Sequence, residues 1–477
     1  MTSFLDSIWL HGNKTALVNP EGHKFTYDFL RQDVESLCSN FQGNKGLAIL
    51  LSKNNKESIV GYLAFLMSDI VPILLAPKVT QFNLKKYIDI YHPQYLYLDF
   101  PFDEESYFEL SKTNSFYLYA SKDDVGAENI HSSLRLLLTT SGSTGSPKLV
   151  RLSDNNLRSN CEMIISSLPM KDGDIAITTL PFHYSYGLSI LNTHLLAGLT
   201  IQLNEYSVVQ REFWKLLYNS KSTTFGGVPF LYQQMNQIGF DKLLNSQVRY
   251  LTQAGGKLAG APLDNIYRTC AIGNIDFYIM YGQTEATARM SVLSPAEAVK
   301  HPGSIGKAIQ PGKFSLTSLE SGDNPSERSV GELIFHGENV AMGYAQKLTD
   351  LQLGDEFKGV LKTGDLAYFD EDGFPYIVGR ISRFGKIRGV RFSLDDLEYL
   401  LQNINVNIVI IEVQDKLFIV ANQDIDINLI DKILKDHVGL RFVDFIYRKM
   451  ECIPRTQSGK VDYQTLSTKL ISAEIIV

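Results

Sequence analysis

The sequence predicts an α/β protein with a large N-terminal domain of mostly parallel, helix-covered sheets and a small α+β C-terminal domain. Three observations support this prediction. The chain has 477 residues, more than one hydrophobic core usually holds. Short apolar runs alternate with longer apolar or amphipathic runs through most of the chain. From about residue 380 this alternation gives way to a compact group of closely spaced strands and helices.

The first strand–helix–strand unit lies near residue 50. Leu47–Leu51 and Val71–Ala76 are short apolar runs, typical of strands that are buried on both faces. Between them, Glu57–Asp69 is apolar almost all round, which indicates a buried helix. Two buried strands joined through a helix are expected to run parallel.

The same alternation continues to about residue 282. Ser153 or Asp154 is suited to begin a helix, because either side chain can accept a hydrogen bond from a free backbone amide there. Further strands are predicted where the sequence reads IAITTL, LTIQL, RYLTQAG and DFYIMYG. Together with the hairpin segments that follow, they form the expected N-terminal domain, residues 1–380.

Residues 381–477 are predicted to form the small C-terminal domain. NVNIVIIEV and KLFIVA read as neighbouring strands, INLIDKILKDHV as a helix and RFVDFIYR as a further strand. A segment of about a hundred residues with this pattern is long enough to fold as a unit.

The composition excludes several classes of function. With 44% hydrophobic and 20% charged residues, the chain has the balance of a globular enzyme. A net charge of −7 gives no basic excess for nucleic acid, and no apolar run is long enough for a membrane span. The opening stretch MTSFLDSIWLHGNK lacks a signal-peptide pattern. Widely separated cysteines indicate reduced thiols and a cytoplasmic location. They are Cys38, Cys161, Cys270 and Cys452.

The stretch TTSGSTGSPK, Thr139–Lys148, is rich in small donors and follows an apolar run. Glycines let backbone amides converge on an anion, hydroxyls add donors and a lysine adds charge, so the stretch is suited to hold phosphate. It fails the GxxxxGK[ST] template of kinase-type loops, because Leu149 follows Lys148. An ordinary surface turn is the alternative, since the same residue types gather in loops.

Five blocks in order make the chain resemble the adenylate-forming superfamily, which includes acyl-CoA synthetases, adenylation domains of peptide synthetases, and luciferase. The blocks are TSGSTGSPK, YGQTEA, GSIGKAIQPG, LKTGDLAYFDEDGFPYIVGR and PRTQSGKVD. The resemblance implies that a carboxylate attacks the α-phosphate of ATP in the presence of Mg²⁺, giving acyl-AMP and pyrophosphate. It also implies transfer of the acyl group to a thiol, either CoA or a phosphopantetheinyl carrier protein, and a mobile C-terminal domain.

The resemblance also assigns roles to residues. Thr140, Ser141, Ser143, Thr144 and Lys148 would cradle the β- and γ-phosphates. Tyr281 would stack on adenine opposite Gly255 and Gly256, with Gly282 and Gln283 beside it. Thr284 would contact the α-phosphate, and Glu285 would bind the metal. Asp365 would accept hydrogen bonds from the two ribose hydroxyls, and Arg380 would help to fix the ribose or phosphate. Lys460 would be the mobile catalytic cation between the substrate carboxylate and the α-phosphate.

The segment after residue 380 is expected to move between the two half-reactions. The resemblance implies that Lys386 and Gly389 line the approach of the thiol, in a stretch rich in basic residues. Ser382 stands at the hinge position, where family members commonly carry Asp or Lys. A small residue there still tolerates hinge motion.

The expected acid pocket is aromatic. The block LPFHYSYGLS contains no Asp, whereas amino-acid-activating relatives normally hold the substrate ammonium with one. An unpaired ammonium would be costly there, so an acyl or aryl acid is favoured over an amino acid. Candidate pocket residues are His183, Tyr184, Tyr186 and Phe230. His183 would orient a carboxylate or gate the pocket, or it is simply a packed core histidine.

Three other interpretations are open. A degenerate relative would bind nucleotide without turnover, although such a protein would not need Lys460. An adenylation enzyme for amino acids would need another partner for the ammonium. A phosphotransferase would release ADP in place of AMP.

Overall fold

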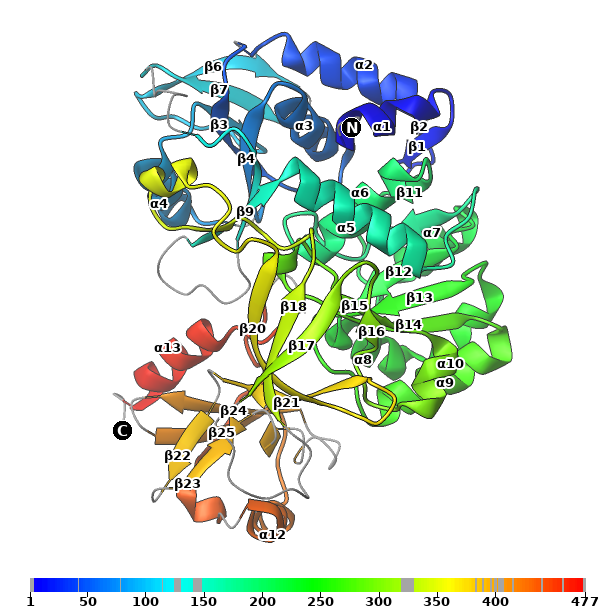
Figure 1. Ribbon diagram of the computed structural model, residues 1–477, viewed down its shortest axis with the longest axis vertical. Helices are drawn as coiled ribbons and strands as arrows, with labels where there is room; N and C mark the ends of the chain where they lie inside the picture. The colour runs from blue at the N-terminus through cyan, green and yellow to red at the C-terminus, as the bar shows by residue number, and fades with distance from the viewer. Residues whose placement is uncertain are drawn as a thin grey trace.

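The computed structural model describes most of the chain, and every structural statement below concerns that part. The described residues are 4–41, 43–77, 79–113, 115–123, 130–139, 148–318, 330–381, 384–387, 390–394, 397–398, 401, 407–413, 416–438, 441–456 and 459–474. Two large sheets with helices between and around them occupy the upper part of Figure 1, and a smaller region lies at the lower end.

The first large sheet has eight strands. In spatial order they are β19 (Gly343–Ala345), β9 (Leu149–Ser153), β8 (Leu134–Thr139), β4 (Ile70–Leu75), β3 (Gly46–Leu51), β5 (Tyr95–Leu98), β7 (Tyr117–Ser121) and β6 (Tyr107–Lys112). Strands β3 and β4 are parallel and buried on both faces, and helix α3 (Lys56–Met67) joins them. The predicted strand–helix–strand unit is therefore confirmed.

The second large sheet has nine strands. Their order is β16 (Lys307–Ala308), β15 (Ser291–Leu293), β14 (Asp276–Tyr281), β13 (Tyr250–Gln253), β12 (Thr224–Gly227), β10 (Ile175–Ile177), β11 (Thr200–Gln202), β1 (Thr15–Val18) and β2 (Lys24–Thr26). The six strands from β14 to β1 are parallel. Their carboxyl ends therefore meet at one edge, where ligands bind in open α/β sheets.

Helices cover both large sheets. They are α1 (Phe4–Ile8), α2 (Tyr27–Cys38), α4 (Gln81–Tyr91), α5 (Asp154–Ser167), α6 (Ser185–Leu196), α7 (Arg211–Asn219), α8 (Pro229–Ile238), α9 (Ala261–Gly273) and α10 (Pro295–Lys300). Helices α5 and α6 lie between the two sheets (Figure 1). Ser153 caps α5, as predicted, by accepting a hydrogen bond from the Asn156 amide at 3.1 Å.

A four-stranded antiparallel sheet follows, formed by β17 (Lys313–Ser318), β18 (Gly331–His336), β20 (Val360–Phe369) and β21 (Pro375–Arg380). The predicted hairpin turn joins β20 to β21, with Gly373 at a φ of 76°. In this hairpin Asp365 is the cross-strand partner of Arg380. The register of one short hairpin thus places two predicted site residues side by side.

The region after residue 380 has its own strands, helices and apolar clusters. It contains β22 (Phe384–Ile387), β23 (Val390–Ser393), β24 (Ile408–Val413), β25 (Lys416–Ala421), β26 (Ile446–Lys449), α12 (Ile427–Val438) and α13 (Tyr463–Glu474). One strand begins later than predicted, because Phe442–Asp444 forms a 3₁₀ turn before β26. The α/β fold class is confirmed, whereas the boundary at residue 380 stays a prediction.

Arg151 on β9 ties a distant loop to the first sheet. Its side chain is fully buried, and its Nη2 lies 2.5 Å from Glu356 Oε2. The same guanidinium donates to the backbone carbonyls of Met342, Tyr344, Leu353 and Gly354. One buried cation therefore fixes the segment that carries Tyr344 into the candidate site. Among the described residues, no helix is long and apolar enough to cross a membrane.

We expect Arg151→Ala to lower the free energy of unfolding by about 3 kcal/mol, because it removes a buried guanidinium that pairs with Glu356 and donates to four backbone carbonyls. Chemical denaturation of the purified variants measures this. Arg31→Ala is the matched control, since Arg31 forms an exposed i,i+4 pair with Glu35, and such pairs are worth about 0.3–0.5 kcal/mol. Equal losses for the two variants would contradict the assigned role of Arg151.

Candidate active site

A buried carboxylate organises one side of the candidate site. Asp365 is 2% exposed, and its Oδ1 accepts a hydrogen bond from Arg380 Nε at 2.7 Å. Its Oδ2 accepts from Gln283 Nε2 at 2.9 Å and from the Tyr281 hydroxyl. Burial and the nearby Asp365 charge raise the pKa of Tyr281 well above its usual value. The hydroxyl therefore stays protonated, and three donors from β14, its following turn and β21 satisfy a single carboxylate.

The turn after β14 brings the YGQTEA block to the carboxyl edge of the second sheet. A Cβ on Gly282 would lie 1.7 Å from the Ala288 carbonyl oxygen, so this close approach of backbone requires glycine. Thr284 Oγ1 lies 3.1 Å from Ser185 Oγ at the start of α6. Buried Asn339 closes the turn by donating to the carbonyls of Ala286 and Arg289.

Glu285 and Lys148 meet around a tyrosine that the sequence analysis did not single out. The Tyr344 hydroxyl on β19 donates to Glu285 Oε1 at 2.9 Å. Lys148 Nζ lies 3.4 Å from the centroid of the Tyr344 ring. Both the predicted metal-binding carboxylate and the predicted phosphate-loop lysine are thus held against one side chain. No local motif marks Tyr344, since it reaches the site only through the pairing of β19 with β9.

The C-terminal region delivers Lys460 to the same site. Its ammonium lies 5.6 Å from the centroid of the Tyr184 ring, and its Cε would contact a Cβ on Gly255 at 3.7 Å. Burial lowers the pKa of Lys460 to about 8, and the positive charge of Arg380 adds to this effect. The charges of Glu285 and Asp365 act in the opposite direction. Lys460 is therefore a partly desolvated cation close to both carboxylates.

Two further contacts seat the Lys460 segment on the larger region. The Arg455 guanidinium lies 4.7 Å from the centroid of the Phe230 ring, at the start of α8. Gly459, with a φ of 79°, faces Val228, whose Cγ2 would lie 2.9 Å from an added Cβ. Only glycine allows this approach without strain.

The aromatic residues of the predicted acid pocket pack at the start of α6. The rings of Tyr184 and Tyr186 meet edge to face at 6.3 Å, and the Tyr186 hydroxyl lies 2.8 Å from Thr252 Oγ1. His183 is 9% exposed, and burial lowers its pKa to about 4. A histidine that is neutral at pH 7 offers no positive charge to a carboxylate, which favours the interpretation of His183 as a packed core residue.

Most of the predicted site residues converge in the described structure. Tyr281, Gln283 and Arg380 surround Asp365, while Gly255 and Tyr184 lie beside Lys460. Gly256 follows in the same turn and faces Pro229. Lys386 lies in β22. The predictions for Thr140, Ser141, Ser143, Thr144, Ser382 and Gly389 lie outside the described residues.

The fold and the site define an α/β protein in which a small C-terminal region places a lysine near the carboxylates of Glu285 and Asp365. The family model described as "AMP-binding enzyme" matches residues 7–345. The chain belongs to this family, and the predicted adenylate-forming superfamily is confirmed.

Relatives that match the sequence differ in how much of their own length the match covers. A 2-succinylbenzoate–CoA ligase of Listeria monocytogenes is 23% identical over 98% of this chain and 99% of its own. An oxalate–CoA ligase of Arabidopsis thaliana is 29% identical over 56% of this chain and 52% of its own. Bacitracin synthase 2 of Bacillus licheniformis is 26% identical over 88% of this chain, which is 16% of that protein. The chain thus spans about half or less of two of these relatives.

Solved structures agree with the fold over nearly the whole chain. An o-succinylbenzoate CoA synthetase from Bacillus subtilis, in complex with its acyl-adenylate intermediate, gives a TM-score of 0.76 at 19% identity and covers 98% of both chains. The same enzyme in complex with ATP and a magnesium ion gives 0.75 at 20% identity, covering 97% of this chain and 98% of its own. At these identities the likeness establishes the architecture.

Proposed function

We propose that the protein is an AMP-forming acid–thiol ligase. A substrate carboxylate oxygen attacks the α-phosphorus of ATP, pyrophosphate leaves, and an acyl-AMP results. A thiol then attacks the acyl carbon and displaces AMP, giving a thioester. The observation that carries this proposal is the position of Lys460 beside Tyr184 and Gly255, where the charges of Asp365, Glu285 and Arg380 all act on it.

The chemical problem in the first step is that both reactants are anions. Catalysis must therefore align them and supply positive charge where they meet. An ammonium held at the cleft in a partly desolvated setting does this more effectively than one in water, because its field is less screened. We assign this role to Lys460, which stands at the edge of the cleft near the carboxyl end of β13.

The nucleotide is proposed to bind where the YGQTEA turn meets the β20–β21 hairpin. Tyr281 and the backbone at Gly255 and Gly256 would enclose adenine, with Gly282 and Gln283 completing the turn. Asp365 and Arg380 would meet the ribose, and Thr284 the α-phosphate. Lys148 and the hydroxyls of residues 140–144 would hold the outer phosphates. The contacts that now satisfy Asp365 pre-orient the carboxylate to accept ribose hydroxyls.

Glu285 is the proposed Mg²⁺ ligand. In the described part of the chain, no group of three or more His, Cys, Asp and Glu side chains is arranged so that it could hold a metal ion. A single carboxylate suits Mg²⁺, which usually keeps water and phosphate oxygens as its other ligands. Tyr344 orients Glu285 through Oε1. When bound, the ion would neutralise charge on the triphosphate.

The acid is proposed to be an acyl or aryl acid that lies against Tyr184, Tyr186 and Phe230. The absence of an acidic residue from the block 180–189 supports this choice over an amino acid. The thiol acceptor is CoA or a phosphopantetheinyl carrier protein, and the relatives named as CoA ligases support CoA.

The thiol-transfer step is proposed to require movement of residues 381–477 against residues 1–380. Ser382 would be the hinge, and Lys386 and Gly389 would line the approach of the thiol. The separate apolar clusters of the two regions support this division. The four free cysteines support a cytoplasmic location.

The test of the proposed function is acid-dependent exchange of pyrophosphate into ATP across a panel of fatty, aryl, hydroxy and amino acids. We expect exchange with at least one acyl or aryl acid, and release of AMP when CoA is added. ADP release would point to a phosphotransferase. Nucleotide binding without exchange for any acid would favour a degenerate binding protein.

We expect Lys460→Ala to reduce acid-dependent exchange by a factor of about 10²–10³, with little effect on the affinity for ATP. The reason is that Lys460 is assigned to the meeting point of the two anions and not to the nucleotide alone. Exchange kinetics and calorimetric titration with ATP measure the two effects.

Lys449→Ala is the matched control for this substitution. Lys449 belongs to the same C-terminal region but pairs with exposed Asp424 at 2.8 Å, away from the cleft. Its replacement should leave both exchange and ATP affinity unchanged. An equal loss of ATP affinity and exchange in Lys460→Ala would show that the role of Lys460 is misassigned.

The pKa of Lys460 predicts the pH dependence of the first step. Because the ammonium is the active form, kcat/KM for exchange should fall as the pH rises through about 8. The limb in kcat should lie at higher pH, since a bound triphosphate favours the charged lysine. Lys460→Arg, which stays charged, should lose the descending limb. A wild-type profile that stays flat to pH 10 would refute this assignment.

A further inference from the structure

Tyr344 touches both charged side chains at the proposed phosphate end of the site. Its hydroxyl donates to Glu285 Oε1 at 2.9 Å, and the centroid of its ring lies 3.4 Å from Lys148 Nζ. The two opposite charges are thus held at different parts of one aromatic side chain. Both residues belong to the described part of the chain, and they form no ion pair with each other within 4.0 Å.

The pairing of β19 with β9 explains the position of the ammonium. Tyr344 is the cross-strand partner of Val150, and Lys148 precedes Val150 by two residues. Side chains two residues apart along a strand point to the same face, so Lys148 is a diagonal neighbour of Tyr344. The strand register therefore places the ammonium over the ring.

Tyr344 is held in place by contacts with three other parts of the chain. Arg151 Nε donates to its backbone carbonyl at 3.0 Å. The ring of Phe357 meets its ring edge to face, with 5.3 Å between the centroids. The same segment is also tied to the YGQTEA turn, because the Ala341 amide donates to the Glu285 carbonyl at 2.9 Å. These contacts fix the Tyr344 hydroxyl relative to Glu285.

The hydroxyl can orient the carboxylate of Glu285 without cancelling its charge. Burial and the nearby charge of Glu285 raise the pKa of Tyr344 above its usual value, so the hydroxyl keeps its proton at neutral pH. It is therefore a neutral donor. It engages Oε1, and no described residue donates a hydrogen bond to Oε2. One carboxylate oxygen is thus fixed by the protein, and the other is available to a metal ion.

The ring holds the Lys148 ammonium less strongly than a carboxylate would. A cation over a tyrosine ring gains less than a cation paired with a carboxylate in a partly buried site. A triphosphate can therefore take Lys148 from the ring more easily than from Glu285. A direct pair of Lys148 with Glu285 would also occupy the carboxylate, and it would have to break before nucleotide and metal could bind.

We propose that Tyr344 is a positioning residue that keeps Lys148 and Glu285 apart and orients Glu285 for Mg²⁺ before ATP binds. This inference rests on the proposed function, which assigns Lys148 to the outer phosphates and Glu285 to the metal. It adds the residue that prevents these two groups from neutralising each other. If Tyr344 served only to pack against Phe357, its substitution would change stability and leave metal binding as it is.

Tyr344→Phe removes the hydroxyl and keeps the ring. We expect the Mg²⁺ concentration needed for half-maximal tightening of ATP binding to rise about 10- to 100-fold, as is usual when the hydrogen-bond partner of a metal ligand is lost. The affinity for ATP without Mg²⁺ should change little, because the ring still separates Lys148 from Glu285. Calorimetric titration with ATP at a series of Mg²⁺ concentrations measures both effects.

Tyr218→Phe is the matched control, since the Tyr218 hydroxyl donates to the Lys242 carbonyl at 3.0 Å on an exposed surface. It should leave the Mg²⁺ requirement unchanged. An unchanged Mg²⁺ requirement in Tyr344→Phe as well would overturn the inference.

Tyr344→Met removes the ring too, and its flexible side chain can fill part of the vacated space. Lys148 should then pair with Glu285, so the affinity for ATP without Mg²⁺ should fall by a factor of about 10, within the range of coupling between contacting residues. Adding Glu285→Gln should tighten metal-free ATP binding in the wild type, because it removes a negative charge near the triphosphate. The gain should be about 10-fold larger in Tyr344→Met, where it also frees Lys148. Equal gains in the two backgrounds would overturn the separating role of Tyr344.

These measurements separate failure of this inference from failure of the proposed function. If the wild type binds ATP and Mg²⁺ but no acid supports pyrophosphate exchange, the proposed function fails, and the binding data still decide the role of Tyr344. If the wild type supports exchange and Tyr344→Phe keeps the wild-type Mg²⁺ requirement, this inference fails alone. Melting temperatures show whether Tyr344→Met is folded. If it is not, the Mg²⁺ requirement of Tyr344→Phe decides the inference by itself.

Discussion

The arrangement of the site depends on the buried carboxylate of Asp365. A charge at 2% exposure persists only if donors surround it, and here the donors come from separate elements. Tyr281 and Gln283 reach it from the end of the nine-stranded sheet, and Arg380 from the last strand of the four-stranded sheet. The hydrogen bonds to this one group therefore tie the two sheets together, close to the point where the chain enters the C-terminal region.

The charges around Asp365 also affect the pKa of Lys460. Glu285 and Asp365 attract its ammonium, while burial and Arg380 oppose it, and the balance lowers its pKa to about 8. A lysine in this state is charged at neutral pH but poorly solvated, so an arriving phosphate or carboxylate gains more from it than from a lysine in water. Tyr344 positions the charged groups on the other side of the site, because its hydroxyl donates to Glu285 and its ring contacts Lys148.

The sequence predicted the local parts of this structure well. Strands β3 and β4, the cap of α5, the β20–β21 turn and helix α12 all follow from short-range patterns of burial, capping and turn residues. The motif residues Tyr281, Asp365 and Arg380 also lie together, as the resemblance implied. Tyr344, Asn339 and Arg289 could not be found in this way. Each acts through contacts far away in sequence, and an isolated tyrosine, asparagine or arginine carries no local signal of them.

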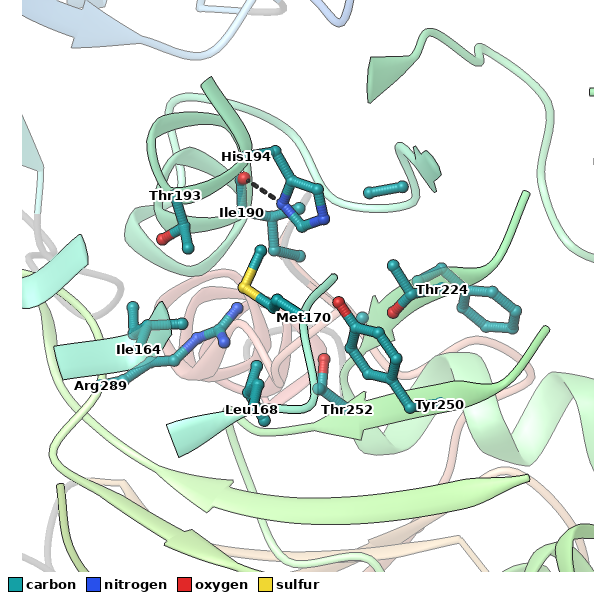
Figure 2. A pocket seen from close by; sticks show the side chains of 13 residues that line it. Ile164, Leu168, Met170, Ile190, Thr193, His194, Thr224, Tyr250, Thr252 and Arg289 are labelled. Atoms are coloured by element: carbon teal, nitrogen blue, oxygen red, sulfur yellow. Dashed lines mark hydrogen bonds between the residues drawn. The ribbon is translucent and has the colours of Figure 1, made fainter. Parts of the chain in front are cut away.

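The buried polar groups around the site differ in how they are satisfied. The carboxylates of Asp365 and Glu285 already have protein donors, so their geometry does not need a ligand. Behind Tyr186, Arg289 and His194 keep unpartnered nitrogens beside a small cavity (Figure 2). A protein that leaves a buried cation unpaired gives up stability. The sequence motifs therefore describe the residues whose polar groups the protein itself satisfies, and they give no sign of Arg289 or His194.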